Sequence, residues 1–174
     1  HGIRLADSII ELPDAIADAL DAYGAVLVEE FIRGSDVSVG VIEKFRNEEL
    51  YALPPVHVSV PDTGLADMQC SRFIHSSLHH EGSLVNHVPS DFSFNEKKAL
   101  MDTARKAHIA LGVSHFSRAD LILTPRGVYL LEVNSIPGLY PGSSFPPMLE
   151  SVGSSVTEFL EHAIALAKDT LHNI

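Results

Sequence analysis

Apolar residues recur three or four positions apart in three stretches, a pattern typical of helices that bury one face. These stretches predict helices over residues 8–23, 93–111 and 156–171. Two of the helices begin with a capping box, in which a serine side chain and a glutamate three residues later satisfy free backbone N–H groups. The pairs are Ser93 with Glu96 and Ser155 with Glu158. Gly24 is placed to end the first helix.

Between the predicted helices, short apolar runs or alternating apolar and polar residues favour strands. We expect strands at residues 26–28, 37–45 and 50–60, and a hairpin of two strands within residues 117–138. Pro54 and Pro55 should break the third strand or confine it to an edge. Residues 61–92 read as a long loop, and such loops in compact domains are often lids. Residues 136–147 read as a second, ordered loop.

The hairpin carries polar residues at a spacing of two, so they share a face of each strand. Arg118 and Asp120 therefore point one way from the first strand, and Glu132 and Asn134 point one way from the second. A three-residue loop, 125–127, would set Asp120 opposite Glu132 and Arg118 opposite Asn134. A two-residue loop would put the two carboxylates on opposite faces unless a bulge intervened.

The two faces of this hairpin should have different surroundings. The face opposite the four polar residues is expected to pack on a core; it holds Ala119, Leu121, Leu123, Tyr129, Leu131 and Val133. On the polar face, neighbouring carboxylates repel unless a cation lies between them. A set of oxygen ligands suits Mg²⁺ or Mn²⁺, which commonly also binds substrate phosphates. The alternating pattern alone leaves open a hairpin whose acids merely face solvent.

Composition narrows the class of protein. A length of 174 residues corresponds to one domain or a large piece of one, and 45% hydrophobic content is ample for a core. The net charge of −11 argues against nucleic acid and anionic membranes as partners. Cys70 is the single cysteine, which excludes an internal disulfide and fits a reducing compartment such as the cytoplasm. No segment is apolar enough to span a bilayer.

Two blocks of sequence resemble the carboxy-terminal part of the ATP-grasp ligases, most closely the D-alanine–D-alanine ligase family. One combines Arg-Ala-Asp at 118–120 with Glu-Val-Asn-Ser-Ile-Pro-Gly at 132–138, and the other covers residues 26–39. The resemblance implies an α+β fold, the large ATP-grasp lobe with an antiparallel sheet covered by helices. Residues 1–28 would then end the small lobe and 29–174 would form the large lobe. His1-Gly2-Ile3 is similar to the tail of the family's glycine-rich phosphate loop, so an amino-terminal domain is expected upstream.

The same resemblance implies the roles of individual residues. Asp120, Glu132 and Asn134 would hold two Mg²⁺ or Mn²⁺ ions, with Asn134 also close to the nucleotide. Glu29, Glu30, Phe31 and Ile32 would surround adenine, and Asp36 would bind the ribose where the family usually has Glu. Arg118 and the Gly138 amide would stabilise the oxyanion of acyl transfer, and Ser143 would bind the carboxylate of the second substrate.

The long loop departs from the family pattern. Residues 67–73 correspond to the lid signature, with Arg72 where the family has Lys and Phe73 where it has Tyr. Arginine can still bind phosphate oxygens, but Phe73 cannot donate a hydrogen bond, which puts the second substrate in doubt. His75 and His79 have the spacing of a helical metal site, although exposed loop histidines are the favoured interpretation.

The implied activity is the ATP-dependent ligation of two D-alanines through an acyl phosphate, for peptidoglycan precursors. Its substrates would be D-alanine and ATP, and the full-length protein is expected to be a homodimer. A different ATP-grasp carboxylate–amine ligase or a D-alanine–D-lactate type of ligase stays open. So does a non-catalytic nucleotide-binding module, since the lid is altered and the small lobe incomplete. The present chain alone is expected to have little or no ligase activity.

Overall fold

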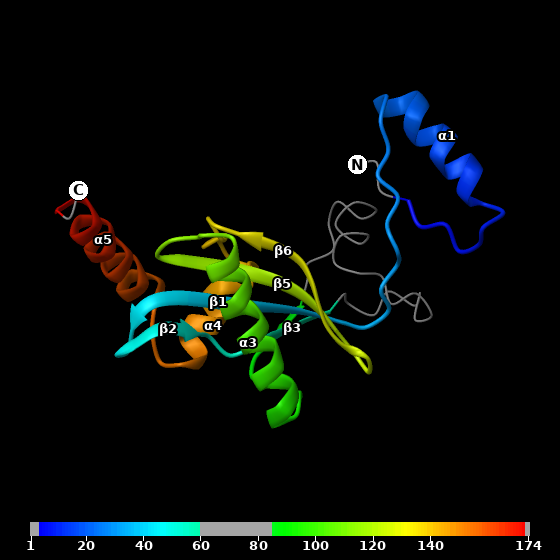
Figure 1. Cartoon of the computed structure of the whole chain (residues 1–174). Helices are drawn as coiled ribbons and strands as arrows, with labels where there is room; N and C mark the ends of the chain where they lie inside the picture. The colour runs from blue at the N-terminus through cyan, green and yellow to red at the C-terminus, as the bar shows by residue number, and fades with distance from the viewer. Residues whose placement is uncertain (1–3, 60–84, 173–174) are drawn as a thin grey trace.

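The computed structural model describes residues 4–59 and 85–172, with side chains up to residue 169. The elements follow in the order α1 Leu12–Tyr23, β1 Ser35–Phe45, β2 Glu48–Ala52, β3 Val56–Ser59, β4 Val85–His87, α3 Phe94–Ala110, β5 Phe116–Thr124, β6 Gly127–Asn134, α4 Phe145–Ser151 and α5 Val156–His172 (Figure 1). The predicted class, an antiparallel sheet covered by helices, is confirmed.

One six-stranded sheet organises the fold around β1. The strand order is β4-β3-β1-β5-β6, and β2 pairs with the part of β1 that β3 leaves free. All the described pairings are antiparallel. Pro54 and Pro55 separate β2 from β3, because proline cannot donate a hydrogen bond to a neighbouring strand. The predicted break is therefore confirmed, and both short strands lie along one edge of β1.

Each face of the sheet has its own hydrophobic core. On one face, Val37, Val39 and Val41 pack with residues of α3 and β5, among them Leu100 and Leu121. On the other, Ile42 and Phe45 pack with α4 and α5 residues, including Phe145, Met148 and Phe159. Figure 1 shows α3 across the sheet on one side and α4 behind it on the other. The polar face of the hairpin lies on the same side of the sheet as this second core, next to it.

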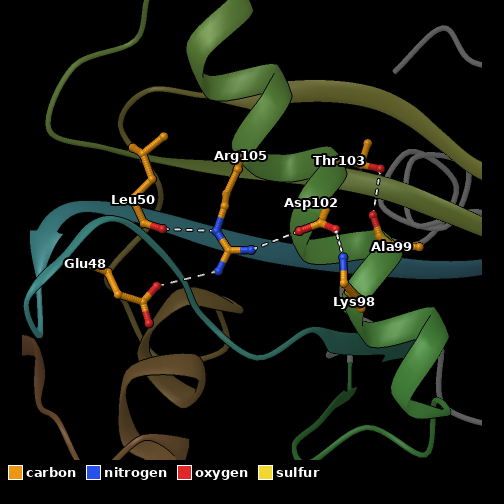
Figure 2. A network of polar contacts seen from close by, with 7 residues as sticks. All are labelled: Glu48, Leu50, Lys98, Ala99, Asp102, Thr103 and Arg105. Atoms are coloured by element: carbon orange, nitrogen blue, oxygen red, sulfur yellow. Dashed lines mark hydrogen bonds and ion pairs between the residues drawn. The ribbon is translucent and has the colours of Figure 1, made fainter.

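Helix α3 is fixed against the sheet by packing and by a polar network (Figure 2). Arg105 donates from Nε to the Leu50 carbonyl of β2 at 3.0 Å and from Nη1 to Asp102 at 3.2 Å. Glu48 lies 3.8 Å from the same guanidinium, and Lys98 reaches Asp102 from one turn earlier. The capping box of Ser93 and Glu96 is present as predicted. The helix therefore holds the face of β1 and β5 that lies opposite the polar residues.

Several sequence predictions are corrected by the structure. α1 begins at Leu12 rather than residue 8, with Pro13 in its first turn, and residues 26–28 form no strand. β4 lies within the stretch predicted as a loop, and α4 begins inside the predicted loop 136–147. At the start of α5, Ser155 caps the Glu158 amide but the Glu158 carboxylate accepts from Ser154, so the second capping box is only half formed.

Candidate active site

The β5–β6 hairpin brings the predicted polar residues together. Its register pairs Arg118 with Asn134 and Asp120 with Glu132, as predicted. Thr124 pairs with Gly127, so of the two loop lengths considered the hairpin has the two-residue one. A bulge between Asp120 and Leu121 restores the alignment that a two-residue loop would otherwise destroy. The pairings are therefore confirmed, through the combination of a two-residue loop and a bulge.

The bulge also changes which β6 residues face the core. Val128 and Val133 pack on the core beneath α3. Leu131, predicted to be buried there, is 38% exposed and lines a cleft on the polar side. Tyr129 lies opposite Ile122, another residue of the polar side, so its predicted place on the core face is also wrong. An extra residue in one strand reverses the alternation of every residue between it and the turn.

Asp120 lies at the centre of the polar cluster and is 1% exposed. Its Oδ1 accepts hydrogen bonds from Ser38 Oγ at 2.7 Å and Arg118 Nε at 3.0 Å. Its Oδ2 accepts from Arg118 Nη2 at 2.8 Å and from Asn134 Nδ2 at 3.1 Å. The guanidinium and carboxylate therefore form a two-point ion pair, the strongest common arrangement for these groups. This pair neutralises one buried charge of each sign.

Glu132 adds a second carboxylate to the cluster. The Nδ2 of Asn134 donates to Glu132 Oε1 at 2.9 Å as well as to Asp120 Oδ2. The two carboxylates thus share one amide donor, and the cluster holds two carboxylates but a single guanidinium, which is paired with Asp120. The excess negative charge and the oxygen donors fit a hard cation such as Mg²⁺. No described group joins three or more His, Cys, Asp or Glu side chains in a way that would hold a metal, so the third ligand here would be the amide of Asn134.

A compact loop after β6 carries two further predicted residues. The Ser143 hydroxyl donates to the Gly138 carbonyl, and the Ser143 amide donates to the Tyr140 carbonyl at 3.1 Å. A Cβ atom at Gly138 would lie 2.5 Å from the Tyr140 ring, so a larger residue there would displace this exposed side chain. Asn86 of β4 donates to the Gly142 carbonyl at 3.1 Å and ties this loop to the sheet. The structure therefore brings Gly138 and Ser143 together.

A cleft of about 770 Å³ lies beside the cluster. All four residues predicted to surround adenine line it; they are Glu29, Glu30, Phe31 and Ile32. Apolar residues of α1 form one wall, and Ile122, Leu131 and Glu132 of the hairpin form another. Glu132 thus belongs to both the polar cluster and the cleft. Asp36 lies beside the cleft, buried on β1 opposite Ile122.

Three residues of the site were not predicted from the sequence; they are Ser38, Ile122 and Leu131. Ser38 follows Asp36 at a spacing of two, so strand periodicity alone could have placed it on the polar face, and its partner Asp120 follows from the register of β1 and β5. Leu131 could not be assigned to the cleft from strand periodicity, because the bulge reverses the side on which it lies. The predicted lid residue Arg72, with Phe73, His75 and His79, lies outside the described residues. Across the described parts of the chain, no helix has the length and apolar character to cross a membrane.

Comparison with known proteins agrees with this arrangement. The D-alanine–D-alanine ligase of Desulforudis audaxviator is 32% identical over 170 residues, which cover 97% of this chain and 52% of that protein. The solved D-alanyl-alanine synthetase A of Vibrio cholerae superposes with a TM-score of 0.75 at 27% identity, covering 99% of this chain and 48% of that one. VanG D-Ala:D-Ser ligase of Enterococcus faecalis superposes with a TM-score of 0.70 at 28% identity, covering 91% of this chain and 43% of that one.

The chain therefore spans about half the length of the curated relatives that it matches. The family described as D-Ala D-Ala ligase C-terminus matches residues 1–165, nearly the whole chain. With that match and the shared fold, this chain belongs to the family of the carboxy-terminal part of D-alanine–D-alanine ligases.

Proposed function

We propose that this chain is the nucleotide- and metal-binding half of an ATP-dependent ligase that joins two D-alanines for peptidoglycan synthesis. The observation that carries this proposal is the position of Glu132. Its carboxylate shares the Asn134 amide with Asp120, and the same residue lines the cleft bounded by Glu29 to Ile32. A nucleotide whose base occupied the cleft would extend its phosphates toward the polar cluster.

Asp120, Glu132 and Asn134 are the residues that would hold two Mg²⁺ or Mn²⁺ ions. Such ions neutralise the charge of the phosphate oxygens during transfer. The rest of the hairpin positions these ligands: Arg118 fixes Asp120 through two hydrogen bonds, and the bulge sets Asp120 opposite Glu132. In the cleft, the backbone and carboxylate at Glu29 and Glu30 would bind the adenine amino edge, and the buried carboxylate of Asp36 would bind the ribose.

In the proposed reaction, the carboxylate of the first D-alanine takes the γ-phosphoryl group of ATP and releases ADP. The amine of the second D-alanine then attacks the acyl carbon, and inorganic phosphate leaves. Arg118 and the Gly138 amide would stabilise the oxyanion of this second step. Ser143, held beside Gly138, would bind the carboxylate of the second substrate. Arg72 would contact the phosphates from the lid.

For the second substrate, a hydroxy acid or D-serine is the competing choice. Phe73 in place of the family's tyrosine supports a ligase of the D-alanine–D-lactate type. A D-Ala:D-Ser ligase is among the similar solved proteins, so the family includes other second substrates. We assign D-alanine because the curated relatives in the comparison carry that activity in their names.

For the protein that contains this chain, we propose the family's domain plan. Residues 1–28 end the small lobe and residues 29–174 form the large lobe, with an amino-terminal domain before them. In support, α1 and the extended residues that follow it lie apart from the helices that cover the sheet (Figure 1). We also propose that the full-length enzyme is a homodimer and works in the cytoplasm, where ATP is available.

The test is phosphate release by the full-length protein with ATP and Mg²⁺. Release with D-alanine alone, together with D-alanyl-D-alanine as the product, is the expected result. Release that requires added D-lactate or D-serine would instead support the alternative ligases. ATP binding without turnover on any of these substrates would contradict the proposal and favour a nucleotide-binding module. The 174-residue chain alone should show little or no turnover in the same assay.

A further inference from the structure

We propose that Ser38 is a positioning residue, whose hydroxyl fixes the carboxylate of Asp120 so that Oδ2 faces the cation site. This inference rests on the proposed function, because it concerns the metal ligands of that site. Ser38 lies on β1 directly opposite Asp120, and its Oγ donates to Asp120 Oδ1 at 2.7 Å. Nothing in the sequence resemblance assigns a role to this serine.

The two oxygens of Asp120 have different surroundings. Oδ2 accepts from Arg118 Nη2 at 2.8 Å and lies 3.1 Å from Asn134 Nδ2, which is itself 2.9 Å from Glu132 Oε1, so this oxygen lies on the side of the second carboxylate. Oδ1 lies on the side of β1, where Ser38 and Arg118 Nε donate to it. Because rotation about the last torsion of aspartate is soft, a carboxylate needs donors at a fixed place to hold one oxygen in a given direction. Arg118 holds both oxygens, and Ser38 adds a second donor to Oδ1 alone. The geometry therefore assigns Oδ1 as the oxygen anchored to β1 and Oδ2 as the one presented to a cation.

Among the residues that donate to Asp120, Ser38 is the best placed to hold it throughout a reaction cycle. Arg118 and Asn134 are proposed to contact the oxyanion and the cation, so their bonds to Asp120 must change as substrates bind. Ser38 is 0% exposed, and its backbone is paired on both sides, with Val56 of β3 and Asp120 of β5. A short side chain on a central strand has little freedom to move. Partners that orient a metal ligand typically contribute 10- to 100-fold to metal affinity.

The experiment measures Mn²⁺ binding by electron paramagnetic resonance in the full-length protein with a non-hydrolysable ATP analogue. Ser38→Ala should raise the dissociation constant of Mn²⁺ about 10- to 100-fold. Ser38→Thr and Ser38→Cys retain a donor, so the variant that folds with the native melting temperature should recover most of the affinity. The apparent activation constant for Mg²⁺ in the ligase assay should rise in parallel for Ser38→Ala.

Ser117→Ala is the matched control. Ser117 is equally buried, lies on the neighbouring strand β5, and uses its hydroxyl for a 2.8 Å contact with His108 outside the site. Its loss should leave Mn²⁺ affinity unchanged. The inference is overturned if Ser38→Ala binds Mn²⁺ within twofold of the unaltered protein, or if both serine variants lose affinity equally as their melting temperatures fall. If the unaltered protein has ligase activity, either of these results would overturn the role of Ser38 but not the proposed function. An unaltered protein that binds no Mn²⁺ would overturn the cation assignment as well.

Discussion

Asp120 and Glu132 share a proposed role but differ in what the fold requires of them, and Asp120→Asn tests that difference. Asp120 is 1% exposed and accepts hydrogen bonds from Ser38, Asn134 and both ends of the Arg118 guanidinium, which is 15% exposed. An amide offers one acceptor oxygen, so its NH₂ group must face donors on one side. Arg118 would also lose the buried charge that balances its own.

Loss of one partner from a buried ion pair destabilises a protein by about 3–5 kcal/mol. For a domain of this size, the melting temperature should fall by about 6–20 °C. Glu132→Gln removes the negative charge at a half-exposed position but keeps an amide oxygen that can still accept from Asn134, so the loss should be at most about 1 kcal/mol. Both variants should lose metal-dependent turnover, but Asp120→Asn alone should unfold at a clearly lower temperature.

The assay is thermal unfolding followed by circular dichroism, with Asp102→Asn as the matched control. Asp102 is likewise paired with an arginine, Arg105, and also with Lys98 (Figure 2). Its side chain is 37% exposed, however. Because exposed ion pairs contribute little, this variant should melt close to the unaltered protein. The reasoning is refuted if Asp120→Asn melts as the control does, or if Glu132→Gln is destabilised to the same extent.

Four further outcomes are expected. Ser93→Ala removes the N-cap of α3 and should lower the free energy of unfolding by about 1 kcal/mol in urea titrations, while Ser114→Ala, a serine outside any described cap, should not. Phe145→Ala empties a fully buried site between α4, α5 and β1. It should lower the free energy of unfolding by about 3–5 kcal/mol in the same titrations, and a loss under 1 kcal/mol would contradict the packing. Burial, followed by the nearby His87, lowers the pKa of His57, while Asp91 opposes the shift. The unfolded chain therefore binds a proton below about pH 6.5 that the folded chain does not, so stability should fall as the pH drops through this value, and less steeply in His57→Gln. Asp36→Ala should raise the KM for ATP about 10- to 100-fold with little change in the KM for D-alanine, and an equal change in both would remove Asp36 from the ribose site.

The polar side of the hairpin could be predicted from the sequence because two local rules act together. A spacing of two fixes the side of each strand on which Arg118, Asp120, Glu132 and Asn134 lie, and repulsion between carboxylates marks their shared side as a cation site. The turn length could not be predicted, because Thr-Pro-Arg-Gly fits loops of two or three residues. The bulge compensates for this, so the pairings were right while the orientations of Tyr129 and Leu131 were wrong.

Other failures have the same source, which is tertiary context. Val26 to Val28 is an apolar run, but no strand among the described residues pairs with it, and Val26 and Val28 line the cleft instead. Helix α4 begins at Phe145, and its next two residues are prolines, which favour a first helical turn as readily as a loop. The role of Ser38 depends on which strand lies beside β1, and the pairing of β1 with β5 joins residues 82 positions apart. No local pattern contains that information.

Anomalous diffraction can locate a cation held by oxygens of two neighbouring strands beside a nucleotide. Crystals of the full-length protein grown with Mn²⁺ and a non-hydrolysable ATP analogue would be measured at the manganese absorption edge. The account predicts an anomalous peak in contact with Asp120 Oδ2, Glu132 and Asn134, with the base in the cleft lined by Phe31 and Leu131. A nucleotide bound with no manganese peak among these three side chains would contradict it.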